Sequence, residues 1–226
     1  MIDPRAVADR HPDALIAALV TLAVQVTERP WSMTRADLDR ARGAGLDDRS
    51  VLHAVLQSSL FGHFNRIADA VGVDLDYVDR FGAPKIEPAT PPYLWPSSPP
   101  DPDRARDIDL SSRDGAANLA AAWQHCALER DAPLTREQRM LIAAVVAERL
   151  GDRSVRARIA QGPADRALVD LASLVTLAPW RLGPAAYEPL RELGLTDDRS
   201  VFDVVATASS AGVFSRMRVA LAGLSR

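Results

Sequence analysis

Three polar residues in the first half of the chain have types suited to acid–base chemistry. His63, Asn65 and Arg66 stand close together in the segment FGHFNRIADAV. A histidine exchanges a proton near neutral pH, and an arginine can hold a carboxylate through two hydrogen bonds. We therefore take His63, Asn65 and Arg66 as candidate catalytic residues that could bind a small carboxylate and move a proton.

The helix expected to carry these residues offers a second interpretation. Apolar residues recur at steps of three and four from Leu52 to Ile67, and this spacing places Ser59 and His63 on the apolar side. A single histidine on such a face is more often a hydrogen-bonded core residue than a catalytic one. His53 and Gln57 fall on another face, which we expect to be exposed or at an interface.

The same helix occurs twice in the chain. Residues 18–71 match residues 167–221 with 24 identities, at an offset of 149 that becomes 150 after Thr196. The matches include a Pro-Trp pair, a Gly-Leu turn and an Asp-Arg-Ser helix start, which alanine-rich composition does not explain. We interpret the pattern as duplication of one helical unit.

The repeat separates the candidate residues from one another. Arg66 recurs as Arg216, whereas His63 is replaced by Val213 and Asn65 by Ser215. Repetition of an arginine in both copies favours a structural role for it. The chemical and structural interpretations of Arg66 both remain open at this point.

Helix signals along the chain predict an all-α fold with eight to ten helices and no strands. Thr34 is an expected N-cap, Thr135 with Gln138 has the pattern of a capping box, and Gly151 is an expected helix end. Gly62 lies inside a helix, where we expect a close approach of another helix to compensate for it.

A proline-rich stretch divides the chain. Eight prolines fall between Pro84 and Pro102, which disfavours helix and sheet there. We expect a helical unit at 1–83, a linker or strap at 84–115 and a second helical unit at 116–226. The apolar residues in PPYLWP suggest that the strap docks on a lobe.

Composition excludes several classes of function. The formal charge of -3 gives no basic field for nucleic acid, and the apolar run at 14–26 is too short to cross a bilayer. Cys126 is the only cysteine, so an intrachain disulfide is impossible and the cytoplasm is the expected location. No metal site is expected at His125 and Cys126, which have no further ligand at helical spacing.

The order of elements resembles a known superfamily. An apolar helix after LTREQR, a short basic helix, an apolar helix ending in Pro-Trp, a Gly-Leu turn and a long helix follow one another. This order, with FNRIADA at 64–70, looks like the alkylhydroperoxidase D-like and carboxymuconolactone decarboxylase-like superfamily. The resemblance implies two such helical lobes in tandem, the first truncated, and by analogy a homo-oligomer.

The resemblance also implies that the peroxidase chemistry is lost. Peroxidases of this superfamily carry a glutamate, a Cys-x-x-Cys pair and a histidine, and the matching positions here are Arg139, Gly151, Ser154 and Arg158. Two thiols are needed to reduce a peroxide and resolve the sulfenic acid. A thiol peroxidase mechanism within one chain is therefore excluded.

Two functional hypotheses follow. In the first, the protein binds a small organic molecule in a helical pocket without a cofactor, as decarboxylase members of the superfamily do, with Arg139, Ser154 and Arg158 as candidate substrate-binding residues for an anion. The same arginines could instead be surface charges. In the second, the protein is a non-catalytic interaction or scaffold protein. Convergence of His63, Asn65 and Arg66 on a cavity would favour the first hypothesis.

Overall fold

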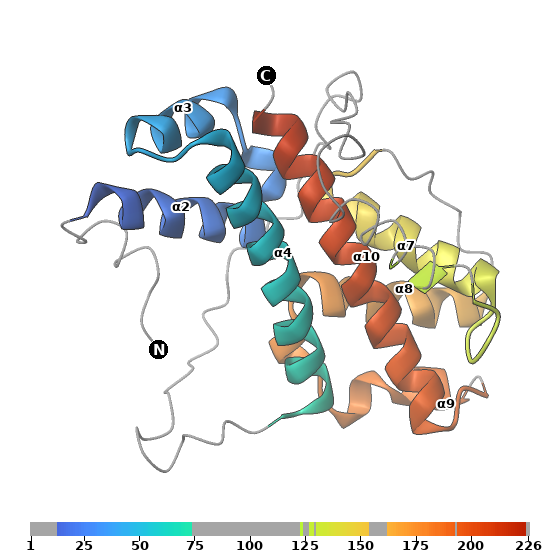
Figure 1. The fold of residues 1–226 in the computed structure, drawn as a ribbon. Helices are drawn as coiled ribbons and strands as arrows, with labels where there is room; N and C mark the ends of the chain where they lie inside the picture. Colours follow the sequence, from blue (N-terminus) through green and yellow to red (C-terminus); the bar gives the residue numbers. More distant parts are fainter. Residues whose placement is uncertain are drawn as a thin grey trace, which may run out of the picture.

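The fold of the described residues is entirely helical, which confirms the expected all-α class (Figure 1). The computed structural model describes residues 13–73, 123, 127–128, 130–153, 162–192 and 194–224. The first part contains α2 (Ala14–Glu28), the 3-10 helix η1 (Pro30–Ser32), α3 (Arg35–Gly43) and α4 (Asp48–Val71). The later part contains α7 (Arg136–Leu150), α8 (Pro163–Leu177), η4 (Pro179–Arg181), η5 (Pro184–Ala186), α9 (Glu188–Glu192) and α10 (Asp198–Leu224).

Side-chain caps explain where several helices begin. The predicted caps are confirmed: Thr34 opens α3, and Thr135 forms a capping box with Gln138 at the start of α7. These side chains accept or donate the hydrogen bonds that the first turn of a helix leaves unpaired. Gly151, in the left-handed conformation with φ 72°, ends α7 as predicted.

The backbone turn after α2 has the same geometry as the turn after α8. Arg29 has φ -144° and ψ 59° before the 3-10 helix η1, and Ala178 has φ -147° and ψ 55° before η4. Further along, Gly45 and Gly194 have φ values of 98° and 94°. Only glycine adopts this conformation without strain, which explains why both segments contain it.

The starts of α4 and α10 are also alike. Arg42 donates to Asp48 at 2.7 Å, and Arg191 donates to Asp198 at 3.0 Å. The aspartate just before each pair caps its helix, since Asp47 accepts from the Ser50 amide and Asp197 from the Ser200 amide. Identical residues in the two segments therefore make the same local contacts.

The long helix α10 lies at the centre of the fold. It packs against α4 on one side and against α7 and α8 on the other (Figure 1). The end of α10 also contacts η1, while α4 contacts η4, so that each long helix reaches the Pro-Trp turn of the other half of the chain.

Two hydrophobic clusters form the core, and both draw on the two halves. One is built on α7 and α8 and includes Ala70 from the end of α4. The other is built on α2, α3 and the start of α4 and includes Ala220, Leu221 and Leu224 from the end of α10. The two halves are therefore interlocked, and neither cluster is built from one half alone.

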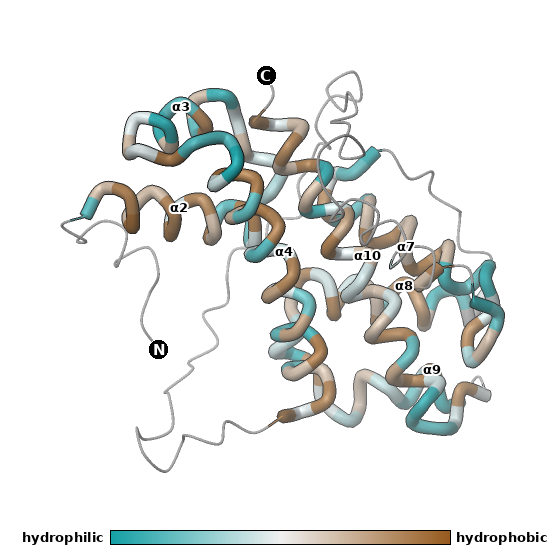
Figure 2. Tube along the Cα trace, viewed as in Figure 1, coloured by the Kyte–Doolittle hydropathy of each residue, from teal (hydrophilic) through white to brown (hydrophobic). Residues whose placement is uncertain are grey.

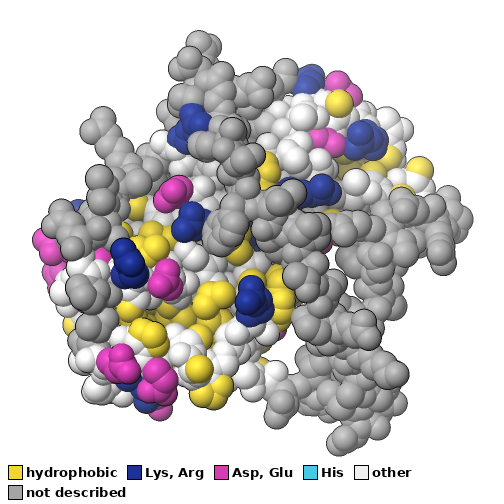
Figure 3. All heavy atoms as spheres, turned by 180° about the vertical axis from the view of Figure 1, so that it is seen from behind, with side chains coloured by type: hydrophobic (Ala, Val, Ile, Leu, Met, Phe, Trp, Pro, Cys, Tyr) yellow, Lys and Arg dark blue, Asp and Glu magenta, His cyan; other side chains and the backbone are white. Residues whose placement is uncertain are grey.

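Hydropathy follows this arrangement along the chain. Brown apolar segments are concentrated on α2, α7, α8 and α10, whereas α3 is largely hydrophilic (Figure 2). Seen from behind, acidic, basic and apolar side chains of the described residues are intermixed (Figure 3). No helix in the described ranges combines the length and the apolar character needed to span a membrane.

Several predictions fall outside the described residues. The linker at 84–115, with PPYLWP, lies there completely, and so do Cys126, Ser154 and Arg158. The boundaries at 1–83 and 116–226 are only partly covered and stay predictions.

Candidate functional site

Arg66 is buried and binds backbone carbonyl groups. The residue is 8% exposed. Its Nη1 donates to the carbonyl oxygen of Gly62 on the same helix at 2.8 Å, and its Nε donates to the carbonyl oxygen of Thr176 at 3.2 Å. Thr176 belongs to the last turn of α8, where carbonyl groups lack helical partners. Arg66 therefore ties α4 to the end of a helix in the other half.

Arg216 makes the reciprocal contact. Its Nε donates to the carbonyl oxygen of Thr27 at the end of α2 at 3.2 Å, and its Nη1 donates to Gly212 at 3.3 Å. Thr27 and Thr176 are equivalent residues of the sequence repeat. The guanidinium of Arg216 also donates to Thr176 at 3.1 Å. Each arginine thus links its own long helix to the other half of the chain.

These arginines also explain the two helical glycines. A Cβ atom added at Gly62 would lie 2.8 Å from Nη1 of Arg66, and one at Gly212 would lie 2.8 Å from Nη1 of Arg216. The expected close approach of another helix at Gly62 is wrong, since the space beside it is filled by an arginine of its own helix. The conformational cost of the glycine gives the guanidinium access to the carbonyl group.

His63 faces α10 and is partly buried. Its Nδ1 lies 2.8 Å from Oγ of Ser209, and the same hydroxyl donates to the carbonyl oxygen of His63 at 3.0 Å. The imidazole ring meets the rings of Phe64 and Trp123 edge-on, with centroids 5.3 and 5.0 Å away. A neutral ring protonated at Nδ1 would donate to Ser209, leaving the hydroxyl proton for the carbonyl group.

Burial controls the protonation of this histidine. Desolvation lowers the pKa of His63 below its usual value, and the nearby charge of Arg66 lowers it further. A Ser-His pair at this distance could in principle activate a nucleophile. Ser209 is only 1% exposed, however, so its hydroxyl is not accessible to a substrate. The contact fits a structural hydrogen bond between α4 and α10.

Asn65 does not join His63 and Arg66. Its side chain is exposed to solvent, whereas Arg66 is buried and His63 points toward α10. Adjacent helical positions point about 100° apart, which accounts for the divergence. The expectation that the three residues converge around a cavity is therefore wrong, because burial separates them.

Arg139 is completely buried on α7. Its guanidinium binds the carboxylate of Asp203 and, at 2.9 Å, the hydroxyl oxygen of Thr207, both on α10. It also donates to the backbone carbonyl oxygens of Arg130 and Ala132. These partners satisfy the charge within the protein. The expected role of Arg139 in binding an anionic substrate is contradicted, since its donors already bind the protein.

The partners of these residues escaped prediction from sequence. Asp203 and Thr207 have no equivalent in the first half, where His53 and Gln57 stand instead. An acidic residue in the otherwise apolar stretch VFDVVATASS was an available signal, because a buried carboxylate requires a cationic partner. Ser209 gave no signal, since a buried serine commonly binds its own helix.

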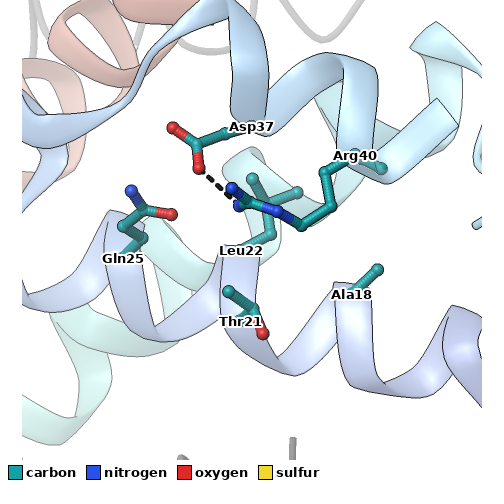
Figure 4. Close-up of a pocket in the computed structure, with 7 residues that line it drawn as sticks. Ala18, Thr21, Leu22, Gln25, Asp37 and Arg40 are labelled. Carbon is teal, nitrogen blue, oxygen red and sulfur yellow. Dashed lines mark hydrogen bonds and ion pairs between the residues drawn. The ribbon is translucent and has the colours of Figure 1, made fainter. Parts of the chain in front are cut away.

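The described residues include one small hollow between α2 and α3 (Figure 4). Gln25, Thr21 and Leu22 of α2 line it opposite Asp37 and Arg40. Its volume of about 10 Å³ is at the lower limit for one water molecule. Asp37 accepts from Arg40 at 2.7 Å and from Thr34, which lower its pKa although burial opposes them. The hollow cannot hold an organic substrate.

Metal coordination has no set of ligands in the described ranges. No three His, Cys, Asp or Glu side chains there lie close enough together to hold an ion. Comparison of the chain with protein-family models, with curated proteins and with solved structures found no match. Function must therefore be argued from the geometry of this protein.

Proposed function

We propose that this chain is an interaction protein that acts through its surface, without chemistry in a pocket. The observation that carries the proposal is the use of Arg66, Arg139 and Arg216 as internal braces. All three are at most 8% exposed and donate to carbonyl or carboxylate groups of the protein. Groups committed to such buried contacts cannot exchange them for a substrate without large cost.

The alternative of a small-molecule protein has less support. It requires a cavity lined by His63, Asn65 and Arg66, and these side chains point in different directions. Descent from the alkylhydroperoxidase D-like superfamily remains a proposal that rests on the order of elements and on FNRIADA. A cytoplasmic location and a homo-oligomeric state are proposed on the same basis, together with the single Cys126.

A ligand titration followed by NMR tests the proposed function. Small carboxylates, 2-oxo acids and lactones are added to the protein at up to millimolar concentration while the imidazole signals of His63 are recorded. We expect no saturable shift of these signals. A saturable shift that is lost in His63→Gln but kept in His53→Gln, the matched exposed histidine of α4, would overturn the proposal.

A further inference from the structure

One side of α4 carries a row of exposed residues that no described helix covers. Residues spaced four apart lie along one ridge of a helix. On α4 this ridge, which we call the α4 ridge, consists of Arg49, His53, Gln57, Phe61, Asn65 and Asp69, and all six are exposed. Phe61 is 62% exposed, and the neighbouring Phe64 is 57% exposed. Two aromatic side chains in water are unusual for a surface without a partner.

The equivalent ridge on α10 is covered by a helix. Its residues Asp203, Thr207, Ala211 and Ser215 are all buried. Arg139 of α7 binds the first two of them, and α7 packs along α10 (Figure 1). The same helical unit therefore accepts a helix on this face in the second half. The face on α4 has the shape to accept one as well.

The order of residues along the α4 ridge is self-complementary. Basic residues, Arg49 and His53, stand at one end, and Asp69 stands at the other. Phe61 is midway, eight residues from both His53 and Asp69. When two copies of such a helix lie antiparallel about a two-fold axis at Phe61, His53 of each copy comes level with Asp69 of the other. Gln57 likewise comes level with Asn65.

The geometry points to a second copy of this chain as the occupant of the α4 ridge, in an antiparallel α4–α4 contact centred on Phe61. An isologous contact uses the same patch on both copies, so each favourable pair occurs twice. The aromatic centre supplies apolar area, and the charged ends fix the direction of the helices. A contact limited to one helix per copy is small, so we expect a dimer that dissociates on dilution.

This inference rests on the proposed role as an interaction protein and adds the identity of the partner. Sedimentation equilibrium of the full chain over a range of concentrations measures the dimer dissociation constant. We expect the dimer of the unaltered protein to weaken at least about 10-fold in Phe61→Glu, because a charge would replace the central aromatic residue. Phe202→Glu, at a 45% exposed phenylalanine of α10, is the matched control and should leave the constant unchanged.

A charge exchange tests the direction of the two helices. His53→Glu and Asp69→Arg should each weaken the dimer by about 5- to 10-fold, since each places like charges together twice. The double variant should recover most of the loss. Circular dichroism on every variant confirms that the fold is intact.

Three outcomes would overturn the inference. They are a monomer at all concentrations, a dimer that tolerates Phe61→Glu, and a double variant no better than the single ones. A monomeric chain that binds another protein through Phe61 would refute the second copy while leaving the proposed function standing. Saturable binding in the ligand titration would refute the proposed function while leaving the dimer measurement unaffected.

Discussion

Polar residues of this protein are distributed by burial and not by a shared site. Arg66 was predictable as a structural residue because it recurs as Arg216. Its partner was not predictable, since the Thr176 carbonyl group lies 110 residues away and a backbone acceptor leaves no trace in the sequence. The type of a residue thus indicates what it can bind, while the fold decides what it does bind.

Protonation of His63 should make the fold less stable in mild acid. Burial lowers the pKa of His63 in the folded protein from 6.5, so the unfolded chain binds the proton more readily. The free energy of unfolding should therefore fall as the pH is lowered through 6.5 toward the depressed pKa, and His63→Gln should lose this contribution. Urea unfolding at about pH 7.5 and 5.5 measures the difference.

The matched control for this histidine is His53→Gln, at an exposed position of the same helix. It should keep the pH dependence of the unaltered protein. Equal pH dependence in His63→Gln and in the unaltered protein would show that the depressed pKa of His63 does not contribute to stability.

At the scale of the elements, local signals were the most informative. Capping residues such as Thr34 and Thr135, together with the terminal Gly151, predicted helix boundaries because they act on neighbouring backbone groups. Gly62 was misread because a missing Cβ indicates only that something approaches. Whether another helix or a side chain of the same helix fills the space depends on the packing.

Close packing of the α10 end against η1 gives a test at this scale. A Cβ atom added at Gly223 would lie 2.3 Å from the carbonyl oxygen of Met33, and backbone cannot move aside as a side chain can. Gly223→Ala should therefore lower the free energy of unfolding by about 2 kcal/mol or more. Chemical denaturation of the variant measures this loss.

Gly43→Ala is the control for this substitution. Gly43 is the last residue of α3, and no atom outside its own helix surroundings lies within 4 Å of an added Cβ. Alanine favours helix by up to about 1 kcal/mol over glycine, so this change should be neutral or stabilising. Equal effects at the two glycines would contradict the close contact of α10 with η1.

For the whole molecule, the sequence predicted the all-α class and the presence of matching segments. It did not predict how the two halves combine. Hydrophobic periodicity identifies which face of a helix is buried but not which helix covers it. The structure places the end of each long helix in the core of the opposite half, with Arg66 and Arg216 crossing in the same sense.

The stability of two arginine variants tests the central claim most directly. Arg66→Met and Arg216→Met each leave buried carbonyl groups without a donor, and we expect each to lower the free energy of unfolding by about 2–3 kcal/mol. Arg49→Met, at an exposed arginine of α4, should change it by less than about 0.5 kcal/mol. Functional residues often reduce stability, so their removal is neutral or stabilising. An Arg66→Met protein at least as stable as Arg49→Met would contradict the structural role of this residue.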